Sequence, residues 1–160
     1  MLAVLAGLLV AAPAASAQES PVTIGRVFTD IKVDDGGPVY LRGRGWHTYV
    51  TVRNSGLTTI PSGVQVTIKG TGGQIGAFAT LQGPSSTTVQ FLGLSAVQRN
   101  RANLAIPFSL RPGESVRILI PVTSSCGTLA GFTAFADSNH RIREFSETNN
   151  QAFAFSCLPG

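Results

Sequence analysis

Apolar and polar residues alternate along much of this chain, and this period of two limits what it can fold into. Residues 64–68 read VQVTI, residues 116–120 read VRILI and residues 151–155 read QAFAF. Successive side chains of an extended strand point to opposite faces, so the pattern predicts β-strands. In the second segment the apolar Leu119 joins Arg117 on the polar face. That strand is therefore predicted to be covered on both faces.

Turn signals separate these segments at short intervals. Residues 34–38 read DDGGP and residues 111–114 read RPGE, and such Gly and Pro clusters end strands. The chain has 18 Gly and only 12% charged residues, a composition that suits a turn-rich β-domain. No segment holds a sustained helical period with caps. We therefore predict an all-β fold, a β-sandwich of about seven or eight short antiparallel strands.

Residues 70–104 interrupt this regularity with Gly-rich and Arg/Asn-rich stretches. We predict an irregular insertion there, holding one or two short strands. The next strand is expected to carry the alternating residues Ile106, Phe108 and Leu110.

The aromatic residues near position 46 raise the question of a binding face. Trp46 has the same parity as Val50 and Val52, which predicts that its ring lies in the core. His47 and Tyr49 have the opposite parity and are predicted to face solvent. An exposed Tyr49 is a weak indication of sugar binding.

The first residues of the chain have the features of a secretory signal. Residues 1–12 are almost wholly apolar, and Ala15-Ser16-Ala17 matches the small-x-small pattern that precedes a cleavage site. We predict a signal peptide over residues 1–17 and a single mature domain over residues 18–160. A buried N-terminal helix is the alternative. The apolar run is shorter than the roughly 20 residues that cross a bilayer, so no transmembrane segment is predicted. The expected location is secreted, periplasmic or at the cell surface.

The two cysteines, Cys126 and Cys157, fit that export. An even, minimal pair in an exported chain predicts one disulfide, and two buried free thiols are the alternative.

The charge balance is modestly basic, at +4. This balance favours anionic surfaces or polymers, but it is far from the dense basic face of a nucleic-acid-binding protein. The arginines include three pairs spaced two residues apart, which are Arg42 and Arg44, Arg99 and Arg101, and Arg141 and Arg143.

An acidic loop between the last two predicted strands, residues 132–137 and 151–157, has two interpretations. In the structural interpretation, which we favour, side chains of the loop accept hydrogen bonds from backbone N–H groups, as Asp and Asn do in turns. Ile142 and Phe145 then plug the end of the sandwich. In the other, carboxylate and amide oxygens bind Ca²⁺. The spacing does not match an EF-hand loop, and two arginines and a histidine in the loop oppose a cation. The loop-structuring candidates are Asp137, Glu144, Glu147, Asn149 and Asn150, and the calcium candidates are Asp137, Asn139, Glu144 and Glu147.

Three segments together resemble one known family, the CARDB or bacterial cell-adhesion-related domain. They are residues 50–56 (VTVRNSG), residues 110–116 (LRPGESV) and the acidic loop with Asp137, Ile142, Glu144, Glu147, Asn149 and Asn150. The resemblance implies an immunoglobulin-like β-sandwich with an interaction role outside the cytoplasm and no catalytic residues. The long segment 70–104 and the cysteine pair depart from the family pattern.

No enzyme is predicted. Asp137, Ser138 and His140 are adjacent in sequence, whereas members of a catalytic triad converge from distant segments. Glu144 and Glu147 lie on one loop, with no evident sugar cleft between them. We expect a non-catalytic binding or adhesion-type module without a cofactor, whose partner is a protein or an envelope polymer. A structural subunit of a larger surface assembly and a small carbohydrate-binding module are the alternatives.

Overall fold

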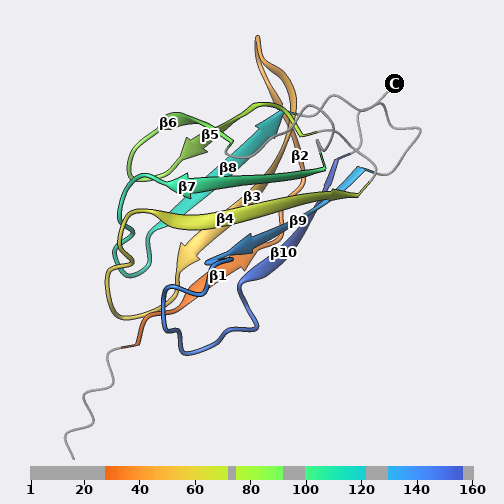
Figure 1. Cartoon of the computed structure of the whole chain (residues 1–160). Coiled ribbons are helices and arrows are strands. Elements are labelled where there is room, and N and C mark those ends of the chain that lie inside the picture. Colours follow the sequence, from red (N-terminus) through yellow and green to blue (C-terminus); the bar gives the residue numbers. More distant parts are fainter. Residues whose placement is uncertain (1–27, 72–74, 92–99, 122–129, 157–160) are drawn as a thin grey trace, which may run out of the picture.

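A computed structural model describes residues 28–71, 75–91, 100–121 and 130–156 (Figure 1). These residues form ten strands in two antiparallel sheets that pack face to face, which confirms the predicted all-β sandwich. The described part contains no helix, and hence none that could cross a lipid bilayer. The predicted signal peptide, Cys126 and Cys157 lie outside the described residues.

The larger sheet has the order β1-β3-β8-β5-β6, and β2 also pairs with β3. Its strands are β1 (Ile31–Asp34), β2 (Pro38–Leu41), β3 (Gly45–Asn54), β5 (Phe78–Gln82), β6 (Thr87–Gln90) and β8 (Ser115–Pro121). The smaller sheet has the order β10-β9-β4-β7. Its strands are β4 (Val64–Thr71), β7 (Arg101–Ile106), β9 (Ala130–Ala136) and β10 (Gln151–Ser156).

The core lies between the sheets and comes from the alternating residues. Val52, Ile68 and Ile118 are completely buried. Leu119, which faces the opposite side of β8, is only 1% exposed, so the prediction that this strand is covered on both faces is confirmed.

Residues 70–104 do contain two short strands, β5 and β6, but these extend the larger sheet beyond β8. The next strand, β7, begins at Arg101 and ends at Ile106. The strand predicted around Phe108 and Leu110 was therefore wrong. The buried positions of β7 are Ala102, Leu104 and Ile106, and the small Ala102 beside polar neighbours concealed the alternation.

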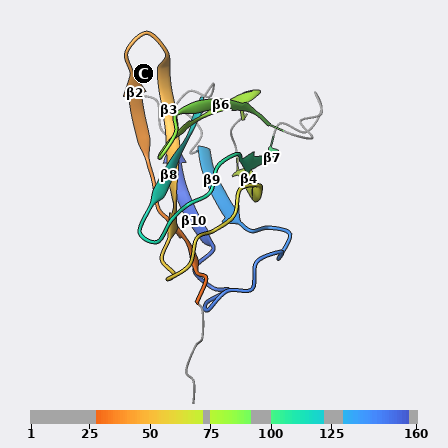
Figure 2. The same ribbon diagram turned by 90° about the vertical axis from the view of Figure 1, so that its left-hand side faces the viewer.

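The prediction for Trp46 was also wrong. Its ring is only half-buried and makes an edge-to-face contact with Tyr40, with 5.5 Å between ring centroids. His47, predicted to face solvent, is 4% exposed, and its Nδ1 lies 3.1 Å from the carbonyl oxygen of Gly45. The β2–β3 hairpin projects past the other strands (Figure 2), so parity with core residues does not bring burial there.

The chain after β1 connects the two sheets at one edge. The Gly36 N–H donates to the Phe153 carbonyl at 3.2 Å, and Gly36 forms a parallel bridge with Ala154 of β10. A Cβ at this position would lie 1.6 Å from the carbonyl oxygen of Tyr49, so only glycine permits the approach. The connection places the segment before β1 beside the β9–β10 loop.

Candidate functional site

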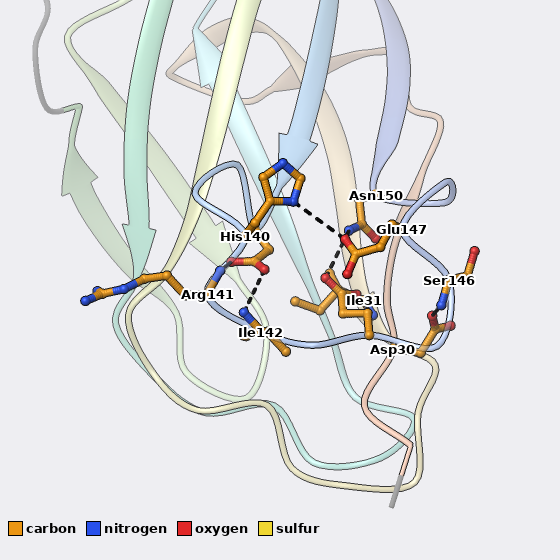
Figure 3. Close-up of polar contacts among 10 residues, drawn as sticks. Asp30, Ile31, His140, Arg141, Ile142, Ser146, Glu147 and Asn150 are labelled. Atoms are coloured by element: carbon orange, nitrogen blue, oxygen red, sulfur yellow. Dashed lines mark hydrogen bonds and ion pairs between the residues drawn. The ribbon is translucent and has the colours of Figure 1, made fainter. Parts of the chain in front are cut away.

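The acidic loop, residues 137–150, connects β9 to β10 at one end of the sandwich. It begins at Asp137, which is 1% exposed and has a φ of 44°. The carboxylate of Asp137 accepts hydrogen bonds from the Arg141 N–H at 3.1 Å and the Ile142 N–H at 2.9 Å (Figure 3). Asp is one of the few side chains that tolerate a positive φ, because it hydrogen-bonds its own backbone. The contacts of Asp137 thus close the first turn of the loop.

Glu144 connects the loop to β1. One carboxylate oxygen accepts a hydrogen bond from the Ile31 N–H, and the other accepts one from Asn150 Nδ2 at 2.9 Å. Burial raises the pKa of Glu144 to about 7. The bonds from Ile31 and Asn150 lower this pKa, and the nearby charges of Glu147 and Asp137 raise it further. Glu144 is therefore the titratable anchor of the loop.

Asp30 makes a second connection to the loop, and sequence reasoning missed it. Its carboxylate accepts a hydrogen bond from the Ser146 N–H at 3.2 Å (Figure 3). It accepts another from Asn149 Nδ2 at 3.1 Å. The Phe145 N–H also donates to the Thr29 carbonyl at 2.9 Å. The sequence shows only that Asp30 directly precedes a strand. That pattern does not indicate a contact with Ser146, which is 116 residues away in sequence.

Asn149 and Asn150 begin the return to β10 through their backbones. The Val33 N–H donates to the Asn149 carbonyl at 2.9 Å, and the Ala136 N–H donates to the Asn150 carbonyl at 2.8 Å. The side-chain Oδ1 atoms of both residues are buried and accept no hydrogen bond from the described residues. The neighbouring carboxylates require donors, so each amide directs its Nδ2 toward them and leaves Oδ1 unpaired.

The two apolar residues of the loop behave differently. Ile142 packs against the core, as predicted. The prediction that Phe145 plugs the sandwich was wrong. Phe145 is 74% exposed and makes an edge-to-face contact with Phe28, with 5.1 Å between ring centroids. The loop is attached at Phe145 through the backbone hydrogen bond to Thr29, and the Phe145 ring lies outside the core.

The calcium candidates lie on the same loop, in different surroundings. The Asp137 oxygens face backbone N–H groups, and Glu144 faces Ile31 and Asn150. Glu147 Oε2 lies 3.6 Å from His140 Nδ1, and Asn139 is exposed. Within the described ranges, no three His, Cys, Asp or Glu side chains gather as a group that could hold a metal ion. Calcium binding by these four residues stays the less favoured interpretation, and the structure does not test it.

A groove of about 430 Å³ runs between this loop and the outer face of the smaller sheet. Its lining includes Thr67 and Lys69 of β4, Arg101 of β7, Phe135 of β9, and His140 and Glu147 of the loop. The Lys69 ammonium lies 4.7 Å from the centroid of the Phe135 ring, a cation–π contact. The groove thus combines an aromatic ring, hydroxyl groups and charges of both signs.

Sequence reasoning singled out the loop that forms one side of this groove, but it predicted no groove and missed the sheet side. Lys69 and Arg101 are opposite each other in the register of β4 and β7, although 31 residues separate them in sequence. Like charges at such positions repel each other. Only the pairing of β4 with β7 brings the two side chains together, and the sequence alone does not specify the register of that pairing.

The three adjacent residues Asp137, Ser138 and His140 have separate partners. Ser138 Oγ lies 2.8 Å from Thr67 Oγ1, and the Asp137 carboxylate is held by the backbone of residues 141 and 142. His140 is directed at Glu147. These three side chains therefore point to different partners.

A scan of protein-family models and a search of curated proteins both found no match. Among solved structures, the chain is similar to the CARDB domain of a Pyrococcus furiosus protein, solved in complex with di-metal ions. The TM-score is 0.47 at 20% identity, over 83% of this chain and 97% of that one. The collagen-binding domain of a Staphylococcus aureus adhesin has a TM-score of 0.41 at 12% identity, over 82% and 98% of the two chains. A longer Staphylococcus aureus collagen adhesin has a TM-score of 0.40 at 12% identity, over 82% of this chain and 50% of that one.

Proposed function

We propose that this protein is an exported, non-catalytic binding module of the cell envelope. Its binding site is the groove between the β9–β10 loop and the outer face of the smaller sheet. The observation that carries the proposal is the composition of this groove, which offers Phe135 together with Lys69, Arg101, His140 and Glu147. Pockets that recognise a ligand combine apolar surface with a few convergent polar groups.

The loop wall of the groove is held in place by bonds on its far side. Glu144 and Asp30 connect the loop to the segment before β1, and neither lines the groove. His140, Glu147 and Thr148 line it from the loop side. A wall fixed from behind is preorganised, which reduces the conformational entropy lost on binding. Glu144 and Asp30 therefore serve the site indirectly, by positioning its wall.

The partner is a protein or an envelope polymer, as the sequence predicts. Export rests on the signal-peptide pattern of residues 1–17. Intact-mass analysis of the native protein tests this part, because a processed chain starts at Gln18. A cytoplasmic protein that retains Met1 would contradict export.

The binding proposal is tested by co-sedimentation of the mature protein with envelope fragments of its source cells. Thr148→Trp places a large ring in the groove wall, at an exposed position. Thr59→Trp is the matched control, an exposed threonine outside the groove. We expect the groove variant to lose most of the sedimenting fraction and the control to keep it.

Four outcomes separate the alternatives. Failure of the native protein to sediment contradicts the binding module. Equal sedimentation of both variants moves the site away from the groove. Release of the protein by soluble sugars alone identifies the carbohydrate-binding alternative, whereas sedimentation that requires one envelope protein identifies the assembly subunit.

A further inference from the structure

The tip of the β2–β3 hairpin presents two arginines that the groove above does not use. Arg42 and Arg44 are exposed and flank Gly43, whose φ is 76°. The Arg44 N–H donates to the Leu41 carbonyl at 2.9 Å, which closes a four-residue turn. A positive φ at the third position of such a turn requires glycine or a similar residue. The turn fixes the backbone positions of the two arginines, and the hairpin tip extends beyond the neighbouring strands (Figures 1 and 2).

A hollow of about 460 Å³ lies between this tip and strands β5 and β6. Among the residues that the structure describes, its lining has no carboxylate. It consists of Arg42, Arg44 and Leu41 from the hairpin, with Thr80, Gln82, Ser86, Thr87 and Thr88 from β5, β6 and the turn between them. Every polar side chain on the β5–β6 side is a hydroxyl or an amide.

The charges of Arg42 and Arg44 are not neutralised by any residue that the structure describes. The ion pairs found within the described ranges lie elsewhere, where Lys32 and Arg53 share Asp34 and His140 faces Glu147. Two guanidinium groups on one turn repel each other when they approach, and an anion between them removes the repulsion. Each also has a planar set of donors that matches a carboxylate or phosphate group.

We propose that this hollow binds an acidic polysaccharide, a hydroxyl-rich chain that carries carboxylate or phosphate groups. The arginines hold the anionic groups, and the hydroxyl and amide side chains of β5 and β6 hydrogen-bond the sugar hydroxyls. The site is separate from the groove beside the acidic loop, since the two linings share no residue. It does not depend on the function proposed for that groove.

An anionic membrane surface fits the hollow less well. Binding at a lipid interface buries an apolar face together with the basic one. The residues of the tip are Arg42, Gly43 and Arg44, and Leu41 beside them is only half-exposed. The exposed Tyr40 makes its edge-to-face contact with Trp46 further down the hairpin. The tip therefore presents charge without an apolar leading edge.

The test measures binding of the mature protein to immobilised polygalacturonate and to a phosphorylated mannan, with neutral dextran as reference. Arg42→Gln with Arg44→Gln removes both charges. Arg141→Gln with Arg143→Gln is the matched control, because this pair has the same spacing, is also exposed and lies in neither lining. Thermal melting of each variant verifies that the fold is intact.

We expect the native protein to bind at least one acidic polymer and not dextran. The hairpin variant should raise the Kd by about tenfold, which corresponds to about 1.4 kcal/mol, and the control should leave it nearly unchanged. The polymer that binds more tightly identifies the anionic group. Equal losses in both variants would show attraction to net charge alone and overturn the site. Absence of binding to either polymer overturns it too, as does arginine-dependent binding to anionic vesicles only.

Discussion

Glu144 makes the stability of this domain depend on pH, and Glu144→Gln should remove that dependence. Burial raises its pKa from 4.5 in the unfolded chain to about 7 in the folded one. Between these values the folded protein binds more protons than the unfolded chain. Stability contributed by the protonated carboxyl is therefore complete below about pH 4.5 and is lost as the pH rises through about 7.

The magnitude follows from the size of the shift. One pKa unit corresponds to about 1.4 kcal/mol, so the full shift sets an upper bound of about 3 kcal/mol. Glu144 is half-exposed, and solvent screening reduces that figure. We expect a loss of about 1 kcal/mol between pH 5 and pH 8, or about 4 °C in Tm for a domain of this size.

Glu144→Gln keeps the shape of the side chain and removes its charge. Its amide nitrogen would face a donor, unless the Asn150 amide rotates and offers its unpaired Oδ1. That rotation preserves a hydrogen bond to the loop, so the variant is expected to fold. Above pH 7 it should be as stable as the native protein or more stable.

The assay is urea unfolding of native and variant protein across pH 5 to 8. The difference between the two free energies of unfolding isolates Glu144 from other titrating groups. Glu114→Gln is the control, because Glu114 also accepts a backbone hydrogen bond, from the Arg111 N–H at 2.7 Å in a turn. Parallel profiles of native protein and Glu144→Gln would refute the reasoning.

Three further predictions concern the loop and the cysteines. Asp137→Ala leaves the N–H groups of residues 141 and 142 without their acceptor and should cost about 2 kcal/mol in urea unfolding, and a cost below about 0.5 kcal/mol would contradict this. Millimolar calcium should leave Tm unchanged. A calcium site whose Kd is one-hundredth of that concentration would stabilise the fold by about 2.7 kcal/mol, so a rise in Tm that Glu147→Gln abolishes would establish a metal site. Thiol titration of the unfolded, unreduced protein should find Cys126 and Cys157 oxidised, and two free thiols would exclude the bond. A disulfide that closes the segment between these two cysteines is worth about 3–4 kcal/mol.

Local sequence determined the strands wherever alternation was strong. The segments around Val66, Val116 and Ala152 formed the strands predicted for them, because a period of two allows only one side of each strand to face the core. The β9–β10 hairpin with its long loop was also readable. Its register runs from Gln151 opposite Phe135 to Ser156 opposite Ala130.

Tertiary structure determined which residues are buried and which form the candidate sites. Trp46 has core parity, but its strand end projects beyond the opposite sheet, and burial requires a covering layer that parity cannot specify. Asp30 and Glu144 anchor the loop through partners more than 100 residues away. Lys69 and Arg101 meet only through the register of two strands. Periodicity is a local property, whereas sites form where distant segments converge, so the sequence by itself determined the sandwich and the packing of its strands determined the candidate sites.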